Sequence, residues 1–596
     1  ADSTINGVTV GKGANSVGGN TVLGVNALDA SVTGNYNTAI GSHALTELTT
    51  GTRNTGIGRQ AGYNITTGTD NTALGYNTLD EVTTADGNTA IGSNALTDNT
   101  SGYNNTAVGF QALGDNQTGN SNTAVGKDAL KLSTTSEHTA VGKGSLAANT
   151  TGSNNNALGY HSLYANTTGG ENVAVGRMSM VTNTAGNYNV AVGNDALYTN
   201  NGSTNVAVGN DALYANTTGG SNVAVGAYAL DANTTASYNV AIGKDALTTS
   251  TTGEKNNAIG FQALRYTTTG TKNNAMGYLA LQNNTTGANN IAIGDEALGS
   301  NTTANDNTAV GRQALTANTT GANNVAIGAN ALDANTTASG NTALGTSALT
   351  ANTTGTGNVA VGWNAMAANT TANYNTAIGY QALTTSTTST GNCAVGFQAM
   401  QDNTTGANST AVGYQALHNN TTGGYNTAVG QNALATNTTG QYQTAVGQGA
   451  LFASNADNNS AFGLSALSSC TTGVHNTAMG RNAATSLTTG TNNVAIGNYT
   501  LAGTVTGAAN VGVGYAALNS LSTGSNNTAV GRDALVSLTT AGGCTAVGHK
   551  AARVNTYSGT TAVGNNALAA NTTGENNTAV GYEALTANTT GNQNTA

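Results

Sequence analysis

The hydrophobic and polar positions of this chain repeat with a 17-residue period. One unit begins at Asn105 and ends at Ser121, and Asn122 begins the next unit. The consensus is N-T-A-V-G-x-x-A-L-x-x-N-T-T-G-x-x, and we number its positions 1 to 17. Large apolar residues therefore return at positions 4 and 9, and small residues return at positions 3, 5 and 8.

The glycine at position 5 measures the period. It recurs 34 times between Gly24 and Gly581, and of the 33 intervals 29 are full 17-residue units and 4 are 16-residue units. A period this short indicates that each unit is one turn of a stacked array and cannot fold alone. Because so short a unit cannot contain two packed helices, the sequence predicts an all-β, parallel β-solenoid of 17-residue coils.

The apolar columns predict where each side chain points. We expect two short parallel strands in each coil, near positions 2–4 and 7–9, with the large residues of positions 4 and 9 forming the core. Neighbouring residues of a strand face opposite ways. Position 3 is Ala or Gly in 33 of 34 units, so we expect it to leave the coil's own core and to lie close to another backbone.

The polar columns predict hydrogen-bonded ladders and a turn. Position 1 is Asn in 29 of 34 units, and amides stacked in register can hydrogen-bond from coil to coil. Positions 12 to 15, usually N-T-T-G, predict a turn in which glycine suits a bend with positive φ. The four short units lose their residue in this turn.

The repeat divides the chain into two segments. Residues 1–19 are predicted to be an irregular N-terminal segment, in which Thr9-Val10-Gly11 looks like a degenerate repeat. Residues 20–596 are predicted to form a continuous β-solenoid of about 34 coils. The sequence ends in mid-repeat, with Asn594 at position 1, so we expect it to be a piece of a longer protein.

Composition supports an ordered ladder and excludes some partners. The chain has 81 Gly and no Pro, and proline cannot donate to a β-ladder. Charged residues make up 7% and the net charge is −10. The few Lys and Arg form no stripe, which argues against nucleic-acid binding. No stretch reaches the ~20 apolar residues of a membrane helix, so we expect no membrane insertion by this segment.

Residues that could carry chemistry are scattered. The six histidines do not share a column on adjacent coils, so no metal site is predicted. Asp195 and Asp211 share position 7 on adjacent coils and are most simply two solvated turn residues. A glycan hydrolase would need acidic residues clustered in a groove, and the columns contain no such cluster. We therefore expect no catalytic residues, no cofactor and no enzyme activity.

Aromatic residues at position 6 are the one candidate binding site. This position follows the strand glycine and is otherwise polar or charged, so it is expected on the outside. Exposed rings in one column could stack on sugars, or they could stabilise their own column or a subunit contact. The residues of this candidate glycan-stacking column are Trp363, Tyr380, Phe397 and Tyr414 on four consecutive coils, with Phe261 and Tyr278 on two more.

The pentapeptides N-T-A-V-G and N-V-A-I-G, each followed by a small-apolar pair, resemble the head repeats of trimeric autotransporter adhesins. That resemblance implies a left-handed β-roll wound as a homotrimer. The longer pattern and the opening Ile5-Asn6-Gly7-Val8-Thr9-Val10-Gly11 also resemble phage tail-fibre and virion structural proteins. The resemblance covers residues 20–596, and the unit is longer than that of the adhesin heads, so its turn must differ.

The resemblance implies a structural fibre shaft that attaches to a host cell or surface, with a phage tail fibre favoured. The alternatives are a bacterial cell-surface adhesin and an extracellular filament. Either way the chain would be extracellular, as a virion appendage or on a cell surface. Its partners would be copies of itself and a cell-surface glycan or receptor. An ice-binding solenoid needs a flat Thr array on a strand, whereas the consensus T-T lies in the predicted turn.

Overall fold

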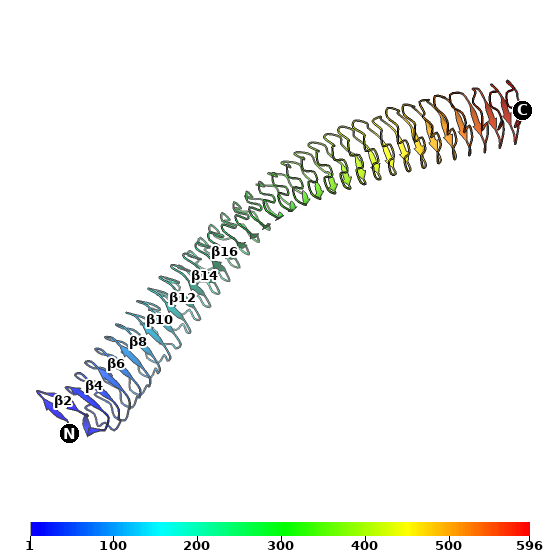
Figure 1. Cartoon of the computed structure of the whole chain (residues 1–596). Coiled ribbons are helices and arrows are strands. Elements are labelled where there is room, and N and C mark those ends of the chain that lie inside the picture. Colours follow the sequence, from blue (N-terminus) through cyan, green and yellow to red (C-terminus); the bar gives the residue numbers. More distant parts are fainter. Residues whose placement is uncertain (1) are drawn as a thin grey trace. The chain divides into compact units, whose positions relative to one another are not determined.

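The computed structural model describes residues 2–596 and is an all-β parallel β-solenoid (Figure 1). Each 17-residue unit is one coil, as the sequence predicts, and contributes one strand, of four residues in β3 and three residues in the coils that follow. The chain divides into two units, which end and begin at Glu296 and Ala297.

The first unit contains β1 to β19 and one 3₁₀ turn, η1. Their bounds are β1 Ser3–Ile5, β2 Val8–Gly11, η1 Ala14–Ser16, β3 Thr21–Gly24, β4 Thr38–Ile40, β5 Thr55–Ile57, β6 Thr72–Leu74, β7 Thr89–Ile91, β8 Thr106–Val108, β9 Thr123–Val125, β10 Thr139–Val141, β11 Asn156–Leu158, β12 Val173–Val175, β13 Val190–Val192, β14 Val206–Val208, β15 Val223–Val225, β16 Val240–Ile242, β17 Asn257–Ile259, β18 Asn274–Met276 and β19 Ile291–Ile293.

The second unit contains β20 to β36. Their bounds are β20 Thr308–Val310, β21 Val325–Ile327, β22 Thr342–Leu344, β23 Val359–Val361, β24 Thr376–Ile378, β25 Cys393–Val395, β26 Thr410–Val412, β27 Thr427–Val429, β28 Thr444–Val446, β29 Ser460–Phe462, β30 Thr477–Met479, β31 Val494–Ile496, β32 Val511–Val513, β33 Thr528–Val530, β34 Thr545–Val547, β35 Thr561–Val563 and β36 Thr578–Val580.

The strands occupy positions 2 to 4 and pair in register with the same positions of the adjacent coil. In β8 and β9, Thr106 pairs with Thr123 in parallel, and β33 and β34 repeat this pattern in the second unit. The N-terminal segment differs, because β1 and β2 pair antiparallel and β2 runs antiparallel to β3. The stretch Thr9-Val10-Gly11 is therefore part of a hairpin that covers the edge of the first coil, and it is not a coil itself.

The second predicted strand, at positions 7–9, does not form. These positions are turns whose residues alternate in backbone hand, as at Gln111 with φ of 55° and Leu113 with φ of 52°. The amide of Leu113 nevertheless donates to the carbonyl of Ala129 on the next coil at 3.0 Å. The coil thus bends sharply here and still keeps its coil-to-coil hydrogen bonds, which satisfies backbone groups that burial would otherwise leave unpaired.

The side chains of the strand point in the opposite directions to those predicted from the sequence. Position 3 is buried inside the coil, with Ala107 and Ala241 both 0% exposed, whereas the large residue at position 4 points outward. Leu158 and Met276, both at position 4, are each 50% exposed. The core consists instead of Ala at positions 3 and 8 and Leu at position 9, together with buried Asn at positions 1 and 12.

The width of the coil explains this reversal. Gly56 stands at position 3, and a Cβ built there would lie 2.8 Å from both Leu45 Cγ and the Ala61 carbonyl oxygen. At this coil even the Cβ of Ala would crowd Leu45, so the Leu of position 9 leaves room only for a small residue at position 3. The one larger residue at this position is Val22, in the first coil. A β-branched residue at position 3 would overpack the interior, so the larger residue occupies the outward position 4.

Two columns of asparagine complete the interior. The amide N–H of Asn122 donates to Asn105 Oδ1 at 3.0 Å, and Asn105 Nδ2 donates to the Gly119 carbonyl at 2.8 Å. This confirms the ladder predicted at position 1. Position 12 forms a second ladder, in which Asn116 Nδ2 donates to Asn99 Oδ1 at 3.1 Å. This ladder was not predicted, because position 12 was expected to belong to a turn.

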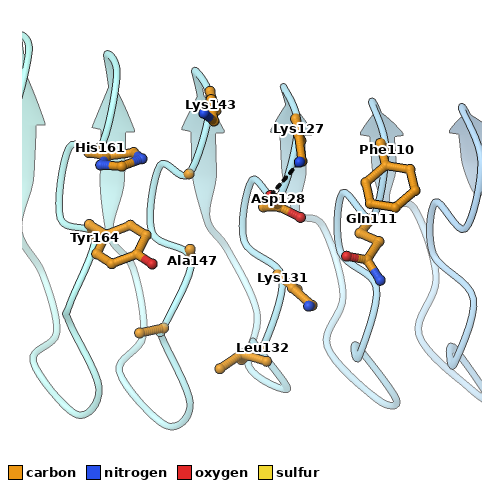
Figure 2. Close-up of a pocket in the computed structure, with 12 residues that line it drawn as sticks. Phe110, Gln111, Lys127, Asp128, Lys131, Leu132, Lys143, Ala147, His161 and Tyr164 are labelled. Atoms are coloured by element: carbon orange, nitrogen blue, oxygen red, sulfur yellow. Dashed lines mark ion pairs between the residues drawn. The ribbon is translucent and has the colours of Figure 1, made fainter.

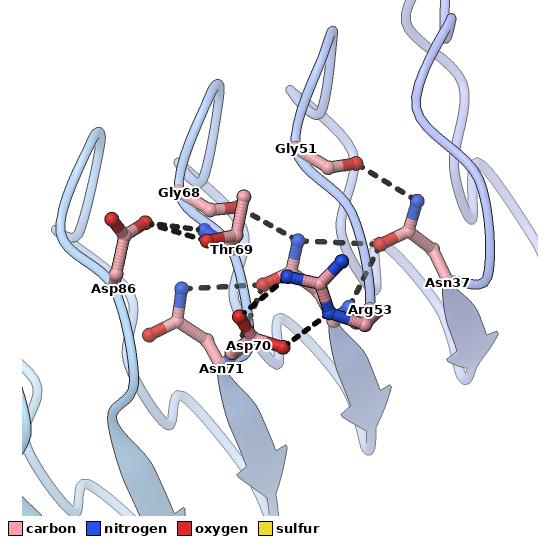
Figure 3. A network of polar contacts seen from close by, with 9 residues as sticks. Asn37, Gly51, Arg53, Gly68, Thr69, Asp70, Asn71 and Asp86 are labelled. Atoms are coloured by element: carbon pink, nitrogen blue, oxygen red, sulfur yellow. Dashed lines mark hydrogen bonds and ion pairs between the residues drawn. The ribbon is translucent and has the colours of Figure 1, made fainter.

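Figure 3 shows the position 1 ladder on earlier coils, where Asn37 Nδ2 donates to the Gly51 carbonyl at 3.0 Å. On the outside of the same coils, Arg53 and Asp70 form an ion pair at 2.6 Å between position 17 of one coil and position 17 of the next (Figure 3). Such exposed pairs contribute little to stability. The buried asparagines therefore carry most of the side-chain bonding between these coils.

The invariant glycine of position 5 is required by a close approach between coils. Gly345 has φ of +137°, and a Cβ built there would lie 2.6 Å from the Gly362 carbonyl oxygen. Position 15 does not have positive φ in any described coil, contrary to the predicted bend. The left-handed residues are instead at positions 7, 9 and 17.

We predict that Gly345→Ala destabilises the second unit by several kcal/mol, because the strained φ and the clash with backbone cannot relax. Gly340→Asn is the matched control, since Gly340 has φ of +71° with open space around it and Asn323 adopts φ of 59° at the equivalent position 17. Chemical denaturation of both variants measures the difference. Equal loss of stability in the two variants would contradict the close-approach argument.

Candidate functional site

The aromatic column of position 6 forms as a stack of parallel rings. The ring centroids of Trp363 and Tyr380 are 4.9 Å apart, and those of Tyr380 to Phe397 and of Phe397 to Tyr414 are each 5.2 Å apart. The rings are 40% to 48% exposed. The in-register ladder produces this geometry, because each ring repeats its neighbour's position one coil along.

Stacking decides which ring surfaces a ligand could reach. Each inner ring turns its faces toward its neighbours and presents its edge to solvent. Only the end rings, Trp363 and Tyr414, keep one face that no other ring of the column covers. A sugar could therefore pack flat against an end ring or lie across the edges of the whole column. The column remains a candidate glycan-stacking site on these grounds.

The second predicted pair also stacks. Phe261 and Tyr278 have centroids 5.4 Å apart and planes 10° from parallel. The ammonium of Lys244 lies 5.7 Å from the Phe261 centroid, on the coil before it. Phe261 is thus enclosed between a cation and a ring, which favours a stabilising role at this pair.

Exposed tyrosines at position 17 were missed by the sequence analysis. Tyr374 is 73% exposed, and Tyr425 and Tyr442 stack with centroids 5.2 Å apart. A count of aromatic residues in every column, and not only at position 6, would have revealed them. They lie at a different corner of the coil from the position 6 column.

The acidic and histidine side chains do not assemble into a reactive group. Among residues 2–596, no group of three or more His, Cys, Asp or Glu could hold a metal ion. Asp195 accepts from Asn194 at 2.7 Å and pairs with Arg177 at 3.5 Å, while Asp211 accepts from Asn210 at 2.6 Å. Asp195 Oδ1 is buried without a hydrogen-bond partner, and burial, followed by the charge of Asp195, raises the pKa of Asp211.

A column of carboxylates on the first unit carries a proton more readily than usual. Burial, followed by the charges of Glu81 and Asp98, raises the pKa of Asp80 to about 6. The pKa of Asp98 is also raised, by burial first and then by Asp115 and Glu81. Stability from these carboxyls is present at low pH and is lost as pH rises through their raised pKa values.

His138 replaces Asn in the inner ladder at position 1. Its Nδ1 accepts the backbone N–H of Asn155 at 3.1 Å, and its Nε2 lies 2.8 Å from Thr135 Oγ1. The accepting Nδ1 fixes the tautomer with the proton on Nε2, which donates to the hydroxyl. Burial lowers the pKa of His138 to about 4, so the neutral ring is the folded form.

Because the folded pKa of His138 lies below its unfolded value, its contribution is present above about pH 6.5 and is lost as pH falls toward 4. We predict that His138→Asn, which restores the consensus residue, removes an acid-dependent loss of up to about 3 kcal/mol. Thermal unfolding of both proteins between these pH values measures it. Both proteins contain Asp80, so its opposite effect on the pH dependence of stability cancels in the difference between them. A constant difference across the range would contradict the assignment.

The single tryptophan of the chain reports on the position 6 column. We predict that a neutral oligosaccharide changes Trp363 emission in a saturable way, and that Tyr414→Ala weakens this binding several-fold because it shortens the column. Tyr442→Ala, which removes a ring at position 17, is the control and should leave the titration unchanged. An emission unaffected by sugar would exclude glycan stacking at this column.

No protein-family model matches the sequence, and no curated protein matches it at a significant level. In the part of the chain that the structure describes, no helix is long and apolar enough to cross a membrane.

Proposed function

We propose that this chain is the repetitive shaft of an extracellular attachment fibre, of the phage tail-fibre kind, in which copies of the chain pack together as a homotrimer. The observation that carries the proposal is the outer face of the strand ladder. Every coil places an apolar residue at position 4 on that face, next to position 2, which is Thr or Val in most coils and Asn, Ile, Ser or Cys in the others. We call this surface the outer strand face.

The extent of the outer strand face favours a partner. With on the order of 50 Å² of apolar surface per coil, the 17 coils from β3 to β19 present on the order of 850 Å², similar to what each partner buries in a stable interface. A typical monomer exposes apolar patches of only about 300–600 Å². The same reasoning applies separately to β20 to β36.

The periodicity of the face favours a second copy as that partner. Apolar side chains recur every ~4.8 Å along the stack, and a partner must match that repeat over many coils. Another copy of this chain has the same repeat, and cyclic symmetry closes the assembly. The interface differs from the one expected from sequence, because the position 3 alanines are enclosed within each coil and cannot contact a neighbour.

The remaining surface suits a shaft. Only 7% of residues are charged, and the threonine hydroxyls of the position 13 turn donate to carbonyls one coil along, as Thr66 does to Thr83 at 3.0 Å. These hydroxyl groups on the outside of the coil therefore join one coil to the next. A bacterial surface adhesin or extracellular filament would use the same architecture, with a different anchoring segment.

A second candidate function follows from the threonines of position 2. Eight consecutive strands, β3 to β10, place Thr at this position in register on the outer strand face. These threonines lie on a strand, unlike the T-T pair of the consensus, which lies in a turn. A monomeric protein that inhibits ice recrystallisation would support this candidate in place of the fibre.

We predict that the triple substitution Ile242→Lys, Ile259→Lys and Met276→Lys dissociates the assembly, because three adjacent charges would be buried at position 4. Light scattering should report three chain masses for the unmodified protein and a smaller mass for the variant. Circular dichroism should show that the coils persist.

The matched control is Tyr238→Lys. Because Lys255 and Lys272 already occupy position 17 on the next two coils, this single change also creates three adjacent lysines, on a different face. It should leave the mass unchanged. A single chain mass for the unmodified protein, or equal dissociation by the triple variant and the control, would contradict the proposed assembly.

A further inference from the structure

A hollow of about 550 Å³ interrupts the first unit between the coils of Phe110 and Tyr164. Figure 2 shows it along the corner formed by positions 6, 7, 10 and 11. Lys127 and Lys131 lie on one side, Lys143 lies above, and His161 and Tyr164 lie on the other side. We call this feature the lysine trough.

The trough is hollow because one coil lacks side chains at this corner. Gly144 occupies position 7, and Ala147 occupies position 10, where the coils on either side carry Lys131 and Tyr164. A Cβ built on Gly144 would lie 2.7 Å from His161 Cδ2. A side chain at residue 144 would therefore displace His161 and fill the trough.

The trough contains several positively charged side chains, although the chain as a whole is negatively charged. Three of the 16 Lys and Arg residues line the trough of a protein with net charge −10. Lys127 is already engaged, 3.8 Å from Asp128 and 5.5 Å from the Phe110 centroid. Lys131 and Lys143 form no ion pair with any carboxylate among the described residues, although Lys143 lies 5.7 Å from the Tyr160 centroid. No carboxylate therefore neutralises these two charges, and they can attract an anionic ligand.

The opposite wall is aromatic. His161 stacks between Tyr160, at 3.9 Å, and Tyr164, at 4.6 Å between centroids. Tyr164 ends this stack and is 42% exposed. Burial, and then the charge of Lys143, holds the pKa of His161 below its usual value, so the wall is neutral at pH 7 and the lysines supply the charge.

We infer that the lysine trough binds an anionic sugar residue, carboxylated or sulfated, whose acidic group is attracted by the charges of Lys131 and Lys143 and whose apolar ring face lies against Tyr164. Ammonium groups bind carboxylate and sulfate through charge-assisted hydrogen bonds, and an aromatic ring packs against the apolar face of a sugar. This inference rests on the proposed function in one respect, that the chain meets a glycan-bearing surface.

The flank of the trough limits the length of the ligand. On the preceding coils, Asp98 and Asp115 line an adjoining hollow with Gln111. Their charge repels a polyanion that continues along the stack, which disfavours nucleic acid. A short acidic oligosaccharide, or the acidic end of a longer glycan, fits between the aspartates and Tyr164.

Calorimetric titration of the full chain tests the inference with three probes: a galacturonate tetramer, a heparin-derived tetrasaccharide and a neutral glucose tetramer. One or both acidic probes should bind, more weakly as salt is raised, and the neutral probe should not. Which acidic probe binds more tightly distinguishes carboxylate from sulfate recognition. Lys143→Gln should weaken binding by about tenfold or more, since it removes a charged donor.

Two matched controls separate the trough from general effects. Lys244→Gln removes a position 6 lysine that lies 5.7 Å from an aromatic ring, as Lys143 does, and should leave binding unchanged. Gly144→Asn should abolish binding by filling the trough. Gly449→Asn is its control at the same position 7, where a built Cβ meets only Ser465 Oγ at 3.7 Å.

Absence of binding by both acidic tetrasaccharides, equal binding of the neutral one, or equal effects of Lys143→Gln and Lys244→Gln would overturn the inference. If circular dichroism shows that Gly144→Asn is misfolded, the comparison of Lys143→Gln with Lys244→Gln alone tests the inference. None of these substitutions lies at position 2 or 4, so light scattering on the same samples reports on fibre assembly separately.

Discussion

The backbone N–H and C=O groups of each coil form hydrogen bonds with the adjacent coils, and this requirement constrains all other features of the structure. Coils repeat at ~4.8 Å, so each residue must follow the path of its counterpart in the neighbouring coil. At position 5 the backbones approach so closely that only glycine fits, as at Gly345. At positions 7 and 9 ordinary residues such as Leu113 adopt positive φ, a strained state that the surrounding ladder holds in place.

The narrow interior follows from the same constraint. A 17-residue coil encloses one Leu from the turn, Ala from the strand and the turn, and two Asn columns. The asparagines satisfy buried carbonyls, such as that of Gly119, which would otherwise cost about 1–3 kcal/mol each. With the inside filled by small and polar groups, the largest apolar residues of the strand are left outside, and the outer strand face results.

The period, the strand at positions 2–4, its parallel register, the position 1 ladder and the aromatic column could be predicted from the sequence, because each depends only on residues repeating in one column. The facing of the strand could not. Alternation shows that Ala107 and Val108 point opposite ways, but choosing the inner one requires the width of the coil, which Leu113 and its neighbours determine. The turn at Gln111 was missed because Leu at position 9 indicated a strand, although Asn, Asp or Gly, which favour positive φ, occupies position 7 in 15 of 34 units. The lysine trough combines different positions and depends on what is missing at Gly144, so no column reveals it.

Cys393 offers the most direct test of assembly through the outer strand face, because it is a natural thiol at position 2 of β25 and is only partly buried in one chain. The other two cysteines are buried inside their coils. The rate of maleimide labelling of Cys393 in the native protein, measured beside a Tyr374→Cys variant at exposed position 17, reports whether the face is covered. Strong protection of Cys393, lost on dissociation by the triple lysine variant, is the predicted result. Labelling of Cys393 as fast as that of the introduced cysteine would contradict the fibre.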